Sequence, residues 1–212
     1  MAHDHVHEEI ASDVRLRLGR RAQRLAVIAI AYNVVEAVVG IAIGRSAGSV
    51  ALLGFGLGAV LELSSGLVIL WQYGHELPQS REVRATRSIA VLFFALAGWI
   101  TTDAVVTLVG NDHPDTSYGG IALALTSLLL MPSLWRAQRQ TGRTLHSNAV
   151  VADSAQKLLC TWMSVVLLIG LAARAATGLS WIDPLAALGL AALALREGQK
   201  TWRGEGCCAV PH

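Results

Sequence analysis

Long apolar runs separated by short polar segments dominate the pattern of this chain. Six runs of roughly 20 residues are long enough to cross the ~30 Å hydrocarbon layer of a bilayer as helices, because each helical residue adds about 1.5 Å. The pattern therefore predicts an all-α membrane protein with six transmembrane helices. The predicted spans are residues 25–44, 46–73, 88–110, 118–135, 149–173 and 182–202.

The sixth span has the least support. Its uninterrupted apolar run, residues 184–195, is short enough for a re-entrant or core helix. Asp183 can cap this helix, and Trp181 and Trp202 lie near its two ends, where aromatic rings favour the membrane interface. We therefore predict that it also spans the membrane.

The placement of basic residues predicts the orientation of the helices. Of the 17 basic residues, 14 fall in segments on the side of the N-terminus, only Arg45 and Arg174 fall on the other side, and Lys157 lies within a span. Positively charged residues concentrate on the cytoplasmic side of membrane proteins. We therefore predict a protein of the plasma (inner) membrane with both termini in the cytoplasm.

Composition agrees with the membrane class. Hydrophobic residues make up 53% of the 212 residues and charged residues 15%, below the quarter typical of soluble domains. The net charge of +2 reflects topology and attraction to anionic lipid, and nothing suggests binding to nucleic acid. We expect a polar cytoplasmic leader (residues 1–24), a six-helix transmembrane domain (25–202), a short cytoplasmic tail (203–212) and no cleavable signal peptide.

Ionisable and amide side chains inside the predicted spans need an explanation. An Asp, Glu or Lys at the centre of a bilayer costs roughly 2.5–3.5 kcal/mol on insertion, so each requires a partner or a purpose. The set comprises Asn33, Glu36, Glu62, Asp103, Asp153, Gln156, Lys157 and Cys160.

Several of these residues are expected to meet at one point. Asp153, Gln156 and Cys160 are spaced i, i+3 and i+7, which places them on one helix face. Glu36, Glu62, Gln156 and Cys160 all fall near the middle of their spans. Carboxylate and thiolate groups bind divalent ions such as zinc, and a cation offsets the burial of negative ligands. Because the ligands must lose protons to bind a metal, such a site can exchange metal for protons.

Structural explanations compete with this interpretation. Asn33, Asp103 and Ser164 can act as hydrogen-bonding contacts between helices. Lys157 lies four residues after Asp153, so the two can neutralise each other as an ion pair without any ligand. For this pair the sequence leaves both alternatives open.

Small residues predict close helix packing. Gly40 with Gly44, and Gly54 with Gly58, are spaced four apart in the first two spans, a spacing that lets membrane helices approach closely.

The two ends of the chain carry further potential metal ligands. His3, His5 and His7 can collect metal ions at a cytoplasmic entrance, or the leader can be a disordered tail. Cys207 and Cys208 offer soft ligands, a lipidation site or an inert tail. A thiol oxidoreductase using that adjacent pair is a further alternative, although no CxxC motif supports it.

Four stretches together resemble a bacterial branch of the cation diffusion facilitator transporters: "YNVVEAVVG", "GSVALLGFGLGAVLELSSG", "VADSAQKLLCTWMS" and "WIDPLAALGLAALALREG". The resemblance covers nearly all six spans in order. It implies a six-helix homodimer that is not an enzyme and that exports zinc and related divalent ions against protons. The cytoplasmic C-terminal domain of many members is missing from this sequence, so dimerisation is expected through the membrane helices.

The resemblance also implies a transport site. In the family, two polar residues four apart on the second helix and two more on the fifth helix form this site, and here they correspond to Gly58, Glu62, Gln156 and Cys160. Gly58 has no side chain, and an amide is a poor zinc ligand. We expect Glu62 and Cys160 to be the primary metal ligands and Gln156 a secondary one.

Two further acids, Glu36 and Asp153, are expected to serve as auxiliary ligands or proton carriers. The missing side chain at Gly58 also supports an alternative, a non-transporting membrane metal sensor or scaffold with the same fold.

Overall fold

The computed structural model describes residues 2–46, 50–75, 77–110, 118–177 and 182–204, and within these ranges the side chains of residues 2–12, 50, 51, 110, 170–177 and 182–186 are left out. The described chain is helical and contains no strand. Its elements are α1 (Ala2–Ser46), α2 (Val50–Tyr73), the short 3-10 helix η1 (Pro78–Arg81), α3 (Glu82–Gly110), α4 (Tyr118–Leu145), α5 (Asn148–Thr177) and α6 (Ile182–Arg203).

Five helices in the described part of the chain, α1 to α5, are long and apolar enough to cross a membrane. The prediction of a multi-pass helical membrane protein is thus confirmed. The sixth helix, α6, forms where the sequence predicts it. That α6 spans the membrane stays a prediction, since its side chains are described only from Ala187 onward.

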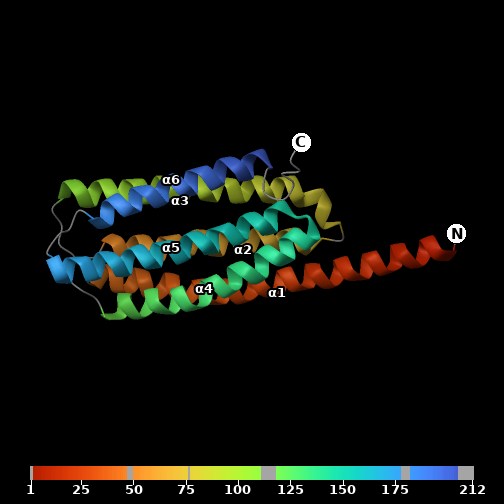
Figure 1. The fold of residues 1–212 in the computed structure, drawn as a ribbon, viewed down its shortest axis with the longest axis horizontal. Coiled ribbons are helices and arrows are strands. Elements are labelled where there is room, and N and C mark those ends of the chain that lie inside the picture. Colours follow the sequence, from red (N-terminus) through yellow and green to blue (C-terminus); the bar gives the residue numbers. More distant parts are fainter. Residues whose placement is uncertain (1, 47–49, 76, 111–117, 178–181, 205–212) are drawn as a thin grey trace.

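The helices form an elongated bundle in which they run along a common axis (Figure 1). α1 packs chiefly on α2, α3 on α6, and α4 on α5. α2 and α5 occupy the middle layer between the α3–α6 and α1–α4 pairs (Figure 1), and they contact each other directly. Polar residues on α2 and α5 are therefore shielded on both sides by other helices.

Close packing of α1 on α2 depends on glycines of both helices. A Cβ added at Gly44 would lie 2.7 Å from the backbone N of Leu53, and one added at Gly56 would lie 2.8 Å from the backbone N of Ile41. Both distances are too short for a side chain, so the close approach predicted for Gly40 and Gly44 is confirmed. Of the second predicted pair, Gly54 faces α3 and Gly58 faces α5 instead.

One end of the bundle carries arginines stacked on tryptophans. α1 starts and α6 ends at this end (Figure 1). A guanidinium group over an indole ring is a favourable cation–π contact. Tryptophan is enriched at membrane interfaces, where one end of its ring is in an apolar environment and the other is in water. Cζ lies 4.5 Å from the ring centre for Arg81 over Trp71, 5.6 Å for Arg139 over Trp135 and 5.7 Å for Arg87 over Trp202.

The leader belongs to the first helix. α1 begins at Ala2, and its N-terminal part extends beyond the rest of the bundle (Figure 1). The side chains of His3, His5 and His7 lie outside the described residues, and so do Cys207 and Cys208 of the tail. The predicted metal-collecting roles of both ends stay predictions.

Candidate functional site

α2 and α5 enclose a small pocket lined by Glu62, Gln156 and Cys160. Glu62 lies in the middle of α2, and Gln156 and Cys160 lie one turn apart on α5. The pocket has a free volume of about 10 Å³ for a water-sized sphere, which is close to the space that one water molecule needs. The rest of the lining is Phe55, Gly58, Leu61, Leu96 and Met163.

The polar groups of this pocket are buried and unsatisfied. The exposed fraction is 4% for Glu62 and 3% for Gln156. Neither carboxylate oxygen of Glu62 has an oxygen or nitrogen hydrogen-bond partner within 3.5 Å in the described structure, although Cys160 and Asn33 lie near enough to influence it, and neither amide atom of Gln156 has one. A buried polar group without a partner costs about 1–3 kcal/mol, and each such case in a native structure needs an explanation. A small polar ligand or cation between these groups would remove the cost.

Cys160 has one neighbour besides the pocket. Its Sγ lies 3.5 Å from Oγ of Ser127 on α4, at the distance of a weak hydrogen bond involving sulfur. The Cys160 thiol is therefore positioned between the pocket and α4.

Glu36 lies near the pocket but does not line it. Its side chain is fully buried, and the Tyr32 hydroxyl donates a hydrogen bond of 3.4 Å to one of its carboxylate oxygens. Its carboxyl is near enough to that of Glu62, across the contact between α1 and α2, for the two groups to interact electrostatically. The amide of Asn33, one turn earlier on α1, is also buried and has no hydrogen-bond partner among the described residues.

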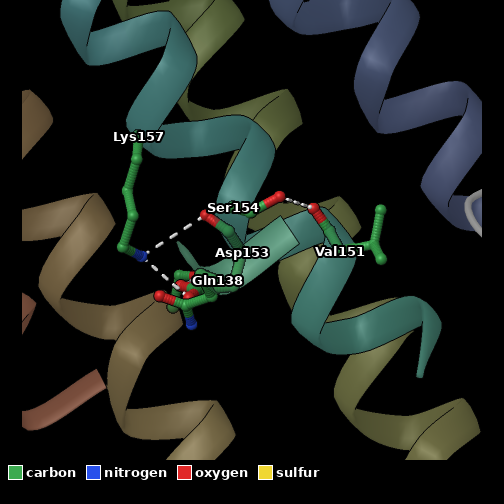
Figure 2. A network of polar contacts seen from close by, with 6 residues as sticks. Gln138, Val151, Asp153, Ser154 and Lys157 are labelled. Carbon is green, nitrogen blue, oxygen red and sulfur yellow. Dashed lines mark hydrogen bonds and ion pairs between the residues drawn. The ribbon is translucent and has the colours of Figure 1, made fainter. Parts of the chain in front are cut away.

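Asp153 is engaged in an ion pair, one of the two alternatives that the sequence left open. Lys157 Nζ lies 2.8 Å from Asp153 Oδ2, and both side chains are fully buried. Figure 2 shows Lys157 reaching along α5 to Asp153. Ser65 of α2 donates a 2.6 Å hydrogen bond to the other carboxylate oxygen, and Gln138 of α4 also donates to Asp153. The carboxylate thus holds α2, α4 and α5 together and does not line the pocket.

The ion pair lies one helical turn from the pocket on both helices. Ser65 is three residues after Glu62, and Asp153 is three residues before Gln156. The charges of Lys157 and Asp153 both act on the Glu62 carboxylate. The predicted site residues therefore fall into three groups. Glu62, Gln156 and Cys160 line the pocket, Glu36 lies beside it on α1, and Asp153 is neutralised by Lys157.

The full set does not form one closed cage. In the part of the chain that the structure describes, no three His, Cys, Asp or Glu side chains come together as a group that could hold a metal ion. A cation in the pocket would therefore be bound by Glu62 and Cys160, and its other ligands would have to come from other kinds of residue.

A second cavity adjoins the first. It has a free volume of about 60 Å³ for a water-sized sphere, and its lining includes Asp103 and Trp99 of α3. Phe55 and Met163 line both cavities. Gly54 makes room here, because a Cβ at this position would lie 3.2 Å from a carboxylate oxygen of Asp103. Asp103 lines this cavity, and its predicted role as a contact between helices stays a prediction.

Sequence reasoning did not single out Met163. It lies three residues after Cys160 on the same face of α5, and it lines the pocket. Its Sδ and Cε lie 4.0 Å and 3.5 Å from where a Cβ of Gly58 would be. The only signal in the sequence was its spacing from Cys160, because a methionine in an apolar run is otherwise indistinguishable from core.

Sequence reasoning also missed a polar junction at the basic end of the bundle. Glu82, the first residue of α3, accepts hydrogen bonds from the Ser147 hydroxyl and from the backbone N–H of Ala149, the latter at 2.9 Å. It also accepts one from Gln72 of α2. A carboxylate at the start of α5 satisfies N–H groups that the helix leaves free and suits its positive end. This junction fixes where α5 begins and hence the register of Gln156 and Cys160.

Comparison with known proteins agrees with this architecture. Residues 26–203 match the family described as "Cation efflux transmembrane domain". A protein named "Uncharacterized transporter sll1263" from Synechocystis sp. is 32% identical over 188 residues. The alignment covers 81% of this chain and 58% of that relative, so the chain spans little more than half of the relative's length.

Proposed function

Since the chain belongs to the cation efflux family, we propose that it carries a divalent metal cation of the zinc class across the membrane, through the pocket between α2 and α5. The family is one of transporters and not of enzymes. The observation that carries the proposal is the meeting of Glu62, Gln156 and Cys160 in one small buried pocket, with no hydrogen-bond partner for the carboxylate or the amide.

In this proposal Glu62 and Cys160 are the primary ligands. Carboxylate oxygen and thiolate sulfur both bind zinc, and Gln156 adds a weaker amide oxygen. Because the acid and the thiol must lose their protons to bind the ion, loading releases protons and unloading takes them up. We therefore propose exchange of metal for protons.

Glu36 and Asp153 have supporting roles. Glu36, buried beside Tyr32 and acting on Glu62 through its charge, is proposed as an auxiliary ligand or proton carrier. Asp153 neutralises Lys157 and so prevents an uncompensated ammonium group next to the cation pathway. A ligand role for Asp153 would require it to leave Lys157.

The proposed setting is the plasma (inner) membrane, with both chain termini in the cytoplasm. We also propose that the chain pairs as a homodimer through its membrane helices. The arginine–tryptophan end supports this orientation, because positively charged residues concentrate on the cytoplasmic side.

The test is metal flux in sealed vesicles that contain the purified protein. We expect uptake of zinc or a related divalent ion that depends on a proton gradient, and a loss of at least about tenfold in Glu62→Gln. Glu197→Gln is the matched control, since it removes a carboxylate from a partly exposed pair with Lys200. Fluxes equal to those of empty vesicles for zinc, cadmium, cobalt, manganese and iron would refute the proposal.

A second candidate function is a membrane metal sensor or scaffold that does not transport. Gly58 motivates it, because this position contributes no donor to the pocket. Under this alternative the parent protein is inactive in vesicles, and Gly58→Asp confers flux. An active parent protein excludes it.

A further inference from the structure

The donor atoms around the pocket are unusually rich in sulfur. Cys160 and Met163 both line it, one turn apart on α5. Opposite them α2 contributes the Glu62 carboxylate, and at Gly58 it contributes no side chain. The remaining polar donor is the uncharged amide of Gln156. The pocket thus offers one anionic oxygen ligand, one weak neutral oxygen and two sulfurs.

The thioether of Met163 is close to α2. Met163 Sδ would lie 4.0 Å from a Cβ at Gly58, one helical turn before Glu62, with Cε at 3.5 Å. The absence of a side chain at Gly58 leaves this space to the end of Met163. Methionine has three rotatable side-chain bonds and a polarizable sulfur, so it can turn Sδ toward a cation without moving the backbone.

We propose that Met163 is a metal ligand and that the transported substrates are soft, thiophilic divalent cations, with Cd²⁺ bound more tightly than hard ions such as Mn²⁺. The inference rests on the proposed function, because it concerns the same pocket. Thiolate and thioether ligands select soft ions, whereas carboxylates, carbonyls and water suit magnesium, calcium and manganese.

The buried surroundings strengthen this selection. The described lining contains one carboxylate, and the neighbouring Asp153 is neutralised by Lys157. A hard ion that gives up its water in this pocket receives few strong oxygen ligands in return. A soft ion recovers the loss through its bonds to Cys160 and Met163.

The test is equilibrium binding of Cd²⁺ and Mn²⁺, two ions of equal charge, to the purified full-length chain. Met163→Leu keeps the size and apolar character of the side chain but removes the sulfur. We expect this variant to bind Cd²⁺ roughly tenfold more weakly, as typical for loss of a contributing group at a metal site, with Mn²⁺ affinity unchanged. Met131→Leu is the matched control: Met131 is buried in the same apolar cluster as Cys160 but does not line the pocket.

A second measurement is independent of how well the variant folds. X-ray absorption on cadmium bound to the unmodified protein should show two sulfur neighbours. A single sulfur in the unmodified protein overturns the inference, and so does an equal loss of Cd²⁺ and Mn²⁺ affinity in the variant.

Glu62→Gln separates the two proposals. If it abolishes binding of both ions while Met163→Leu changes neither, the pocket is the metal site and only the role of Met163 is wrong. If Glu62→Gln leaves binding of both ions intact, the site in the proposed function is wrong as well.

Discussion

Replacing Asp153 by Asn tests whether the buried ion pair holds the helices around the pocket. The structure places Lys157 Nζ 2.8 Å from Asp153, with both side chains fully buried. Asn keeps the shape of the side chain but leaves the ammonium group without a counter-charge, and it offers one acceptor oxygen where Ser65 and Gln138 donate to two. Removing one partner of a buried pair costs about 3–5 kcal/mol, and we expect this loss in the free energy of unfolding.

The double variant Asp153→Asn/Lys157→Met makes the reasoning specific. It removes the uncompensated charge, so most of the loss should be recovered, leaving about 1–2 kcal/mol for imperfect hydrogen bonds to Ser65 and Gln138. Glu197→Gln is the control, because the Glu197–Lys200 pair is partly exposed, with exposed fractions of 34% and 41%. A pair of that kind contributes about 0–1 kcal/mol.

The assay is reversible unfolding of the detergent-solubilised protein, followed by the loss of helical circular dichroism. If Asp153→Asn destabilises no more than Glu197→Gln, the ion pair is not buried as described. If the double variant is as unstable as the single one, the loss comes from disrupted packing and not from an unpaired charge.

Two further predictions concern the pocket and its support. Gly58→Asp adds a hard anionic ligand one turn before Glu62 and should raise Mn²⁺ affinity relative to Cd²⁺ affinity by roughly tenfold. The control Gly58→Ala should leave this ratio unchanged. An equal preference for the two ions in both variants would contradict the reasoning. Glu82→Gln replaces the carboxylate that accepts the Ala149 N–H by a neutral amide, which weakens this hydrogen bond. The free energy of unfolding should fall by about 1–3 kcal/mol, and hydrogen exchange at the start of α5 should become faster. Unchanged exchange there would show that the junction does not fix the start of α5.

Much of the fold follows from the sequence because hydropathy is a local property. A run of apolar residues must leave water whatever its neighbours are, and its backbone must be helical in lipid. The runs beginning at residues 25, 88 and 118 fall within α1, α3 and α4. Some helices are longer than the predicted membrane spans. α4 continues past Trp135 to Leu145, because the arginine-containing segment that follows the apolar run is also helical.

The candidate pocket was partly accessible from sequence. Helical spacing placed Gln156 and Cys160 on one face, and counting from the span ends placed Glu62 at the same depth. Both quantities depend on the geometry of a single helix. The structure brings these three side chains around one pocket, but Glu36 lies outside its lining.

Other features depended on how the helices pack. The spacing of Asp153 and Lys157 allowed either an ion pair or a ligand, and Ser65 and Gln138, from two other helices, are what hold Asp153 in the pair. Met163 had no polar signal of its own, and its sulfur reaches the pocket because Gly58 of another helix leaves the space open.

By itself, then, the sequence determined an all-helical membrane protein with rare ionisable groups at a common depth, since the transfer of each residue into lipid and its angle on a helix are set within its own segment. Tertiary structure alone decided which of those groups share a pocket, which neutralise each other, and that a methionine lines the same pocket as the acid. These outcomes depend on the rotation of one helix against the next, which only the packing of the whole bundle fixes.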